Sequence, residues 1–326
     1  MPTYIVTGCA GFIGWKTSER LLQQGARVVG IDNLNNAYDP RLKVWRLRQL
    51  HQYPNFQFVR ADITEKAALE SVLQNSHPEA VFNLAARAGV RQSLQDPWSY
   101  YDTNVIGTLN LLELCREQGI SKFVLASTSS VYGAGTPPFR EEDASDRPLS
   151  PYAASKRAAE LLCATYHALY GLDITVLRYF TVYGPAGRPD MSLYIFAERL
   201  LRDEPLEIFG DGMQERDFTY VDDIAEGTIR ALRPLGFAVI NLGNSQRVRL
   251  LDAIAILEDA LQRRARLVFY PAHPADVPST EAEISRAKAL LGWEPRTPFA
   301  EGVRRLVQWH LHSRCELETH ADGNPP

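Results

Sequence analysis

The chain has 326 residues, of which 45% are hydrophobic and 23% are charged, so it is long enough to bury the core of one large domain or of two closely packed lobes. Its formal net charge of −4 gives no electrostatic reason to expect nucleic acid or an anionic membrane as a partner. The four cysteines form no CxxC pair, and no apolar run approaches the ~20 residues of a membrane span, so we expect no disulfide framework, no metal site and no transmembrane helix.

The first predicted element is a buried parallel strand, because the run Thr3–Thr7 is rich in β-formers. Three glycines follow at every third position, and a helix is predicted from there to about Gln24. A strand, a glycine-rich turn and a helix start bring backbone N–H groups close to a pyrophosphate. The glycine spacing is one residue longer than the common dinucleotide fingerprint, and an ordinary tight turn is the alternative interpretation. The candidate cofactor contacts in this stretch are Gly8, Gly11, Phe12, Ile13 and Gly14.

Short apolar runs alternate with helical stretches along the chain. Further strands are predicted at residues 26–31, 56–59, 80–84, 122–126, 174–178 and 238–242, and helices near 42–51, 66–74, 100–118 and 152–170. This alternation predicts an α/β fold with a doubly wound parallel sheet that carries helices on both faces.

The pattern becomes less regular after residue 180, where proline and glycine are more frequent. We therefore expect a dinucleotide-binding domain at residues 1–180, with its sheet and helices completed by about 220–242. A smaller mixed α/β substrate lobe is expected at 181–313 and a flexible tail at 314–326. Ligands are expected at the carboxyl ends of the strands, between the lobes.

The cellular location is indicated by the cysteines and by the first strand. Scattered thiols are typical of a reducing compartment. The strand predicted from residue 3 leaves no room for a signal peptide before it. We therefore expect a cytoplasmic protein.

An acidic residue, Asp32, ends the second predicted strand, 18 residues after Gly14. A carboxylate at this place accepts hydrogen bonds from both adenosine ribose hydroxyls and repels a 2′-phosphate, so it favours NAD over NADP. A turn aspartate is the alternative. Amides of Asn33 and Asn36 are candidates to help. Asp62 and Ile63 follow the third strand and are candidates to face the adenine, although Asp62 is equally consistent with a helix cap.

The fourth predicted strand closes with small residues, which allow a dinucleotide to lie across the strand ends or, alternatively, a helix to pack tightly. Arg87 and Arg91 follow and are candidates to reach a diphosphate or carboxylate, with solvated surface arginines as the alternative. Asn104 lies within a helical stretch, where asparagine has no propensity reason to be, so we expect it to brace the chain behind the site. The remaining cofactor candidates here are Leu84, Ala85 and Ala86.

The residues that can carry chemistry lie between positions 127 and 156. Hydroxyl groups of Thr128, Ser129 and Ser130 emerge at the carboxyl edge of the fifth strand. Tyr152 and Lys156 are spaced i, i+4 on a predicted helix and therefore share one face. A lysine beside a tyrosine is expected to lower the phenol pKa, which makes Tyr152 a candidate general base or acid. A lone YxxxK pattern is weak, but here it follows a glycine-rich loop and an acidic strand end.

Taken together, these residues resemble the extended short-chain dehydrogenase/reductase (NAD-dependent epimerase/dehydratase) family of nucleotide-sugar enzymes. The resemblance extends to about residue 312 and also includes the segment 178–185. It implies a Rossmann-type domain, a tightly held NAD that Phe180 also contacts, and a UDP- or dTDP-sugar substrate. It further implies a homodimer, with the helices near 100–118 and 152–170 paired in a four-helix bundle.

Within that family the segments 33–43, 183–191 and 215–227 are most similar to those of the UDP-glucuronate 4-epimerases. The resemblance implies that Arg188 faces the sugar carboxylate and that Thr181 helps. Hydroxyls at Ser129 and Ser130 stand where related dehydratases and decarboxylases carry carboxylates. The full set of implied substrate contacts is Arg87, Thr128, Ser129, Ser130, Tyr152, Thr181, Arg188, Arg216 and Asp276.

The expected function is therefore the C4 epimerisation of UDP-glucuronate to UDP-galacturonate through a 4-keto intermediate. Tyr152 is the expected base, Lys156 and Thr128 assist it, and NAD shuttles the hydride. The alternatives are a UDP-glucose/UDP-galactose-type 4-epimerase, a UDP-glucuronate decarboxylase and, more remotely, an NAD-sensing scaffold without turnover.

Overall fold

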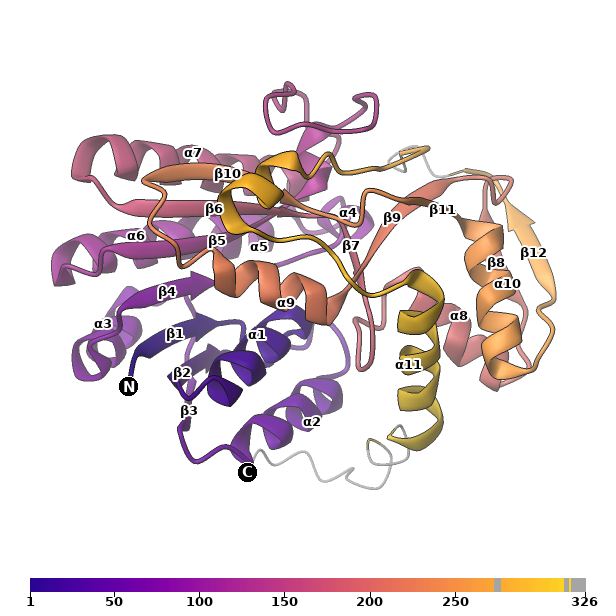
Figure 1. Cartoon of the computed structure of the whole chain (residues 1–326), viewed down its shortest axis with the longest axis horizontal. Helices are drawn as coiled ribbons and strands as arrows, with labels where there is room; N and C mark the ends of the chain where they lie inside the picture. The colour runs from indigo at the N-terminus through magenta and orange to yellow at the C-terminus, as the bar shows by residue number, and fades with distance from the viewer. Residues whose placement is uncertain (273–276, 314–316, 318–326) are drawn as a thin grey trace.

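The computed structural model describes residues 1–272, 277–313 and 317, and its main feature is a seven-stranded sheet (Figure 1). The strands lie in the order β10-β6-β5-β4-β1-β2-β3, and every neighbouring pair is parallel. Their bounds are β1 Thr3–Thr7, β2 Arg27–Asp32, β3 Phe56–Arg60, β4 Ala80–Asn83, β5 Lys122–Thr128, β6 Asp173–Tyr179 and β10 Phe237–Leu242. The order in which the strands are added reverses between β1 and β4, and doubly wound folds bind ligands at this point. The predicted α/β parallel sheet is confirmed.

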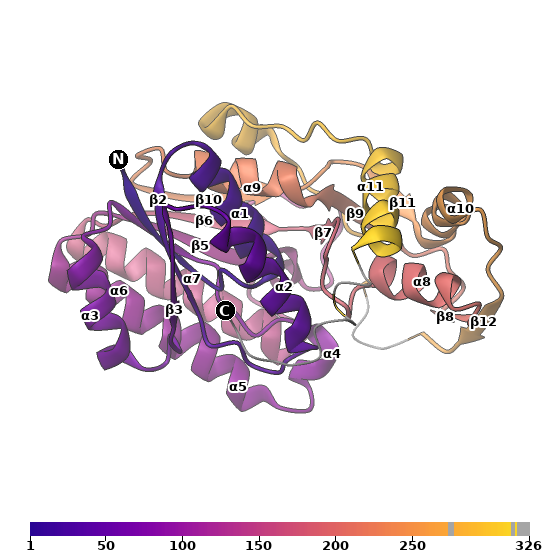
Figure 2. The ribbon, with the colours of Figure 1, turned by 90° about the horizontal axis from the view of Figure 1, so that it is seen from below.

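Helices cover both faces of this sheet (Figure 2). On one face lie α1 (Phe12–Gln23), α2 (Pro40–His51) and α9 (Val221–Arg230). On the other lie α3 (Lys66–Ser76), α6 (Gly107–Gln118) and α7 (Pro151–Tyr170). Successive strand residues alternate between the two cores: Val6 packs towards α1, and Ile5 towards α6. Both are fully buried, as a sheet covered on two faces requires.

The helix predicted near 100–118 is interrupted in the structure. It begins as α5 (Pro97–Tyr101), after the short helix α4 (Val90–Ser93), and continues into α6 through the π-helical turn η1 (Asp102–Ile106). A π-helical turn adds one residue to the helix and often occurs at functional sites. This turn carries Asn104 into the interior.

A smaller region follows β6 and has its own core (Figure 1). Two small sheets form it, one with the order β11-β9-β7 and one pairing β12 with β8. The strands are β7 Thr181–Tyr183, β8 Leu206–Phe209, β9 Glu215–Tyr220, β11 Arg247–Arg249 and β12 Leu267–Tyr270. The helices of this region are α8 Ser192–Leu201, α10 Leu250–Leu261 and α11 Phe299–His312, whereas the π-helical turn η3 Ala287–Leu291 packs against α9 and β10 of the large sheet. The sequence indicated a smaller, less regular lobe here but did not resolve these elements.

The chain returns from the smaller region to the large sheet through α9, which packs on α1, and β10, which pairs with β6. The domain limits 1–180, 181–313 and 314–326 remain predictions, and residues 314–316 and 318–326 lie outside the described part of the chain. Among the described residues, no helix has the length and apolarity that crossing a membrane would require.

Candidate active site

The glycine-rich turn after β1 has the close packing that a dinucleotide site needs. Gly8 adopts φ +69°, and a Cβ there would lie 2.7 Å from the backbone nitrogen of Ala85. A Cβ on Gly14 would lie only 2.0 Å from the carbonyl oxygen of Gly8. Helix α1 begins at Phe12 and has Gly11 as its N-cap, with no side chain capping its first N–H groups. These N–H groups are therefore directed at the space where a pyrophosphate would bind, and the cradle fits one.

Asp32 lies buried at the end of β2, directly beside this turn. Its carboxylate accepts hydrogen bonds from the backbone N–H groups of Ala10 (3.2 Å) and Leu34 (2.8 Å). The ammonium of Lys43, which is also buried, lies 3.4 Å from the same carboxylate. Asp32 therefore serves as a turn aspartate and stands next to the glycine-rich loop, so the two interpretations of the sequence are compatible.

The residues expected around the adenine fall into two groups. The amide of Asn33 donates to the carboxylate of Asp62 over 2.6 Å, and Asp62 also accepts from the backbone N–H (2.9 Å) and hydroxyl (2.8 Å) of Thr64. Burial opposes ionisation, but these hydrogen bonds outweigh it and lower the pKa of Asp62. Ile63 is buried against Gly107 of α6. Asn36, in contrast, is exposed, and the structure does not bring it to this group.

Asn104 braces the loop after β4, as the sequence predicted. Its side-chain oxygen accepts from the N–H of Arg87 over 2.9 Å, and its amide nitrogen donates to the carbonyl of Arg87 (3.0 Å) and to the hydroxyl of Ser155 (2.9 Å). The loop that holds Leu84, Ala85 and Ala86 is therefore tied to α7, the helix of Tyr152. The amide protons of Asn104 are both used in this brace.

Residues 128–130, here called the hydroxyl segment, meet the pair of Tyr152 and Lys156 where β5 ends and α7 begins. Thr128 caps the short 3₁₀ helix η2 (Ser129–Tyr132), since its hydroxyl accepts from the N–H of Ser130 over 3.2 Å. Ser150 caps α7 by accepting from the N–H of Ala153 over 3.2 Å, and Pro151 takes the first helical position. Lys156 donates to the carbonyl of Ala126 in β5 over 2.8 Å.

Burial dominates the electrostatics of this pair. It raises the pKa of the Tyr152 phenol above its ordinary value, while hydrogen bonding to Thr128 and the positive charge of Arg188 lower it. Burial also lowers the pKa of Lys156 to about 8, against the charge of Glu160. The expectation that Lys156 gives Tyr152 a lowered pKa is therefore not met in this structure. Arg188 is the cation whose charge acts on the phenol, against the opposing charge of Asp190, and the Tyr100 and Tyr152 rings pack in a T-shaped arrangement with centroids 6.0 Å apart.

Arg188 lies close enough to Tyr152 for its charge to lower the pKa of the phenol, and its contact with a sugar carboxylate remains a prediction. Its guanidinium forms a bidentate ion pair with Asp190, with N···O distances of 3.0 and 2.6 Å. About a quarter of the Arg188 side chain (26%) is exposed. Thr181 begins β7 and is half-buried, whereas Phe180 packs in an aromatic cluster 6.5 Å from both Tyr132 and Phe139. The loop therefore presents a charged group next to the phenol.

Arg91 and Arg216, two further candidates from the sequence, lie near the strands of the smaller region. The guanidinium of Arg91 lies over the ring of Phe209 at 4.5 Å, and Phe209 stacks on Tyr270 at 5.7 Å. Arg216 on β9 is half-buried and donates to the carbonyl of Glu215 over 2.8 Å. Asp276 lies outside the described residues, so its role remains a prediction.

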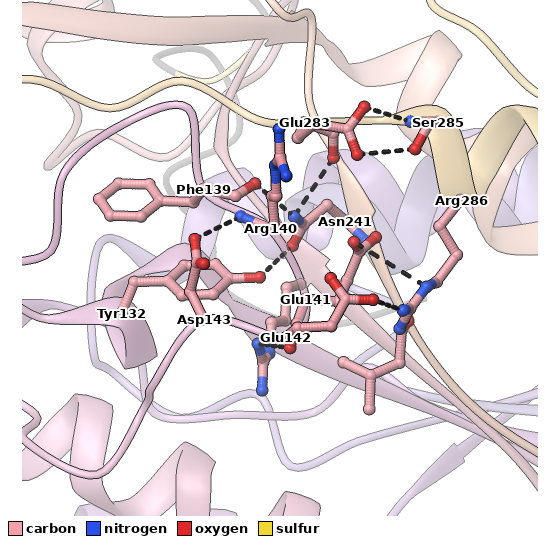
Figure 3. A network of polar contacts seen from close by, with 12 residues as sticks. Tyr132, Phe139, Arg140, Glu141, Glu142, Asp143, Asn241, Glu283, Ser285 and Arg286 are labelled. Carbon is pink, nitrogen blue, oxygen red and sulfur yellow. Dashed lines mark hydrogen bonds and ion pairs between the residues drawn. The ribbon is translucent and has the colours of Figure 1, made fainter.

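A polar network holds the loop that connects the hydroxyl segment to α7 (Figure 3). Its centre is Asn241 at the end of β10, which is fully buried. Asn241 accepts from the Tyr132 hydroxyl (2.7 Å), donates its amide to the Phe139 carbonyl (3.0 Å) and donates its N–H to Glu141 (2.8 Å). The Tyr132 ring also stacks on Phe139 at 4.8 Å. The network therefore fixes η2 relative to the large sheet.

A buried ion pair supports α7 one turn beyond Lys156. Glu160 accepts two hydrogen bonds from Arg178 of β6, at 3.0 and 2.8 Å, and one from Ser127 of β5 at 2.5 Å. Arg178 also lies 4.8 Å from the Tyr132 ring. Both ionic side chains are almost fully buried. The pair therefore connects β5, β6 and α7 directly beneath the catalytic candidates.

Sequence reasoning missed four residues that line or support this site: Lys43, Arg46, Tyr100 and Asp190. The first two interrupt the apolar inner face of α2, where Leu42 and Leu47 are buried. A charged residue on the apolar face of a predicted helix was the signal that could have found them. No comparable signal marked Tyr100 or Asp190.

Comparisons with known proteins agree with this geometry. The model of the NAD dependent epimerase/dehydratase family matches residues 4–243. The chain is 54% identical to a UDP-glucuronate 4-epimerase of Thermodesulfobacterium geofontis, over 95% of this chain and 96% of that protein.

Two solved structures extend the comparison. One is a UDP-glucuronic acid 4-epimerase from Bacillus cereus in complex with UDP-glucuronic acid and NAD, at 38% identity and a TM-score of 0.89, with 94% of this chain and 98% of that one covered. The other is a UDP-glucose 4-epimerase from Thermotoga maritima with UDP-glucose, at 32% identity and a TM-score of 0.88, with coverage of 96% and 99%.

Proposed function

Because the chain belongs to the NAD-dependent epimerase/dehydratase family, we propose that it is an NAD-dependent enzyme that converts UDP-glucuronate to UDP-galacturonate by inverting C4. The observation that carries this proposal is the placement of Arg188, whose charge acts on the Tyr152 phenol. A cation beside the base favours a sugar that bears a carboxylate next to the reacting carbon, because the ion pair adds charge-assisted hydrogen bonds. A hydroxymethyl group at C6 gains little from such a cation.

The residues divide the work as follows. Tyr152 takes the proton from O4, and the Thr128 hydroxyl bonds the same oxygen. NAD, when bound, supplies the acceptor and donor for the C4 hydride. Lys156 binds the nicotinamide ribose hydroxyls from its place beside β5. The 4-keto sugar then turns within the pocket, and Tyr152 returns the proton to O4 once the opposite face of C4 has been reduced.

The carboxylate must also be protected during this reaction, since a 4-keto-uronate is a β-keto acid that can lose CO₂. Arg188, Thr181 and the hydroxyls of Ser129 and Ser130 hold the carboxylate in a geometry that disfavours this loss. The uronate is thereby epimerised and keeps its six carbons.

The cofactor candidates around Gly8, Asp32 and Asp62 fit NAD for two physical reasons. The cradle excludes side chains near the pyrophosphate, and a buried carboxylate at the end of β2 disfavours a 2′-phosphate. The proposed contacts to the uridine diphosphate are Arg87, Arg216 and Asp276.

The direct test is to incubate the purified protein with UDP-glucuronate and follow the products by NMR. UDP-galacturonate is expected, at an equilibrium reached from either sugar. A UDP-pentose product, or no product with the cofactor present, would contradict the proposal.

A neutral UDP-hexose is the second candidate substrate, because the chain is 32% identical to a UDP-glucose 4-epimerase. The variant Arg188→Ala distinguishes the two. It should cripple turnover of the uronate, whereas an enzyme for neutral hexoses would keep its activity.

We also propose a homodimer formed by α5, α6 and α7. Large apolar side chains on α5 and α7 are exposed, among them Trp98 at 79%, Leu161 at 54% and Leu169 at 66%. A row of exposed apolar groups on neighbouring helices is stabilised when a second copy covers it. Light scattering should give twice the chain mass, and Leu161→Arg should halve it.

The free, buried cysteines Cys9, Cys115 and Cys163 support the proposed cytoplasmic location, where thiols stay reduced.

A further inference from the structure

Arg46 of α2 is a buried cation that the reaction described above does not use. Its side chain is among the largest that the fold buries completely, at 0% exposure. An arginine is rarely placed there without a complete set of partners, because burying unpaired N–H donors is costly.

All five N–H donors of Arg46 have an acceptor. Nε donates to the carbonyl of Ala186 over 3.1 Å. One terminal nitrogen donates to the carbonyl of Ala10 (2.9 Å) and to the hydroxyl of Tyr38 (2.7 Å). The other donates to the carbonyls of Ala186 (2.7 Å) and Gly187 (3.0 Å). These acceptors are neutral oxygens, so what the guanidinium does here is hold backbone in place.

The backbone that it holds belongs to two segments far apart in sequence. Ala10 lies inside the glycine-rich turn, between Gly8 and Gly11. Ala186 and Gly187 directly precede Arg188. The guanidinium therefore fixes the loop that carries Arg188 against the loop that would carry the cofactor pyrophosphate. The ring of Phe12, 5.9 Å from the guanidinium carbon of Arg46, closes the same junction.

The held loop has a backbone conformation that needs support. Ala186 is fully buried and adopts φ +50°, a left-handed conformation that is strained for a non-glycine residue. Its carbonyl receives two of the five hydrogen bonds of Arg46. Because Arg188 follows Ala186 by two positions, the direction of its side chain depends on the backbone conformation of Ala186.

We propose that Arg46 is a positioning residue for substrate specificity: it holds the loop 186–187 so that the Arg188 guanidinium meets the C6 carboxylate of the sugar. The inference rests on the proposed function, since it deepens the account of how a uronate is recognised. Arg46 itself does not contact the sugar and acts through Arg188.

The test measures binding, in a Tyr152→Phe background that prevents turnover. Dissociation constants for UDP-glucuronate and UDP-glucose are measured by calorimetry with NAD present, and their ratio reports discrimination for the carboxylate. Arg46→Met keeps an unbranched apolar stem and removes the donors, and should reduce the discrimination about tenfold, the size of one lost charge-assisted contact. Arg46→Lys retains the charge but cannot form five bonds, and should give a smaller reduction.

A double variant separates positioning from a general loss of stability. In an Arg188→Ala protein, the further change Arg46→Met should alter the ratio by less than about twofold, because the residue through which it acts is gone. A merely structural Arg46 would weaken both ligands equally and leave the ratio unchanged in either background. Arg48→Met, on the same helix and half-buried, is the matched control and should leave the ratio as it is.

The outcomes distinguish a failure of the positioning role of Arg46 from a failure of the proposed function. If Arg188→Ala lowers the discrimination and neither Arg46 variant does, the positioning role is overturned while the proposed function stands. If Arg188→Ala leaves the discrimination unchanged, the proposed uronate specificity is wrong, and the positioning role that depends on it is wrong as well. Should Arg46→Met not fold, Tyr38→Phe removes one acceptor and is expected to reduce the ratio about two- to threefold. An unchanged ratio in Tyr38→Phe would then count against the positioning role.

Discussion

The cofactor half and the sugar half of the site are built by different means. The cofactor half consists of the ends of regular elements: strands β1, β2 and β4, the start of α1, and glycines that let the backbone approach closely. The sugar half consists of loops that side chains from regular elements hold in place: Arg46 of α2 binds the loop before Arg188, and Asn241 of β10 binds the loop before α7. Backbone geometry sets the first half, and a few buried polar side chains set the second.

The largest expected effect concerns the cofactor half. In Gly14→Ala the new Cβ would lie 2.0 Å from the carbonyl oxygen of Gly8, so strand, turn and helix must move apart. We expect the purified variant to contain no measurable NAD, as determined by extraction and absorbance. Gly25→Ala is the control: a Cβ there meets nothing within 4 Å, so its φ of +83° should lower stability without removing NAD. A Gly14→Ala protein that retains NAD would show that the close contact is not needed.

The next effect concerns the junction of the two halves. Tyr152→Phe removes the proposed base and should lower kcat by roughly 10²- to 10⁴-fold, the usual contribution of general acid-base catalysis. NAD content and the melting temperature should change little, since the ring still packs against Tyr100. Tyr101→Phe, on an exposed position of α5, should keep full activity. Substantial activity in the Tyr152→Phe protein would require another base.

The two halves also differ in how far the sequence predicts them. The parallel sheet, the glycine-rich turn and Asp32 follow from local patterns of apolar and small residues. Arg46 joins α2 to a loop 140 residues away, and no local pattern contains that contact. Asn104 was recognisable because asparagine is out of place in a helix, and its brace was found as predicted. The expected effect of Lys156 on Tyr152 was not found because helical spacing gives a shared face but not the environment, and burial raises the pKa of the phenol.

A smaller effect is expected from the sugar half alone. Arg188→Ala should lower kcat/KM for UDP-glucuronate about 100-fold, while NAD content stays unchanged, because Arg188 belongs neither to the glycine-rich turn nor to the end of β2. The pH profile adds a second measurement. The charge of Arg188 lowers the pKa of Tyr152. Because Tyr152 acts as the base in its ionised form, kcat should rise with pH through this pKa, and removal of Arg188 should shift the rising limb to higher pH. An unshifted limb would mean that another group sets the ionisation of Tyr152.

The smallest effect tests whether the scaffold of the sugar half is held by ionised side chains. Asp217 of β9 is fully buried and accepts from the N–H groups of Asn244 (2.6 Å), Ser245 (3.0 Å) and Ala282 (2.9 Å), and burial raises its pKa to about 6. The folded state therefore binds this proton more tightly than the unfolded state, whose aspartates have a pKa of about 3.9. The contribution of Asp217 to the free energy of unfolding is greatest below about pH 4, falls as pH rises through 6, and levels off once the folded-state carboxyl is fully ionised. Urea unfolding of the wild type and of Asp217→Asn at pH 4.5, 6 and 7.5 should show a stability difference that shrinks as pH rises across this window. A difference that grows with pH would mean that the three N–H groups outweigh burial and that the ionised carboxylate is what holds the loop at 244–245 to the segment at 282.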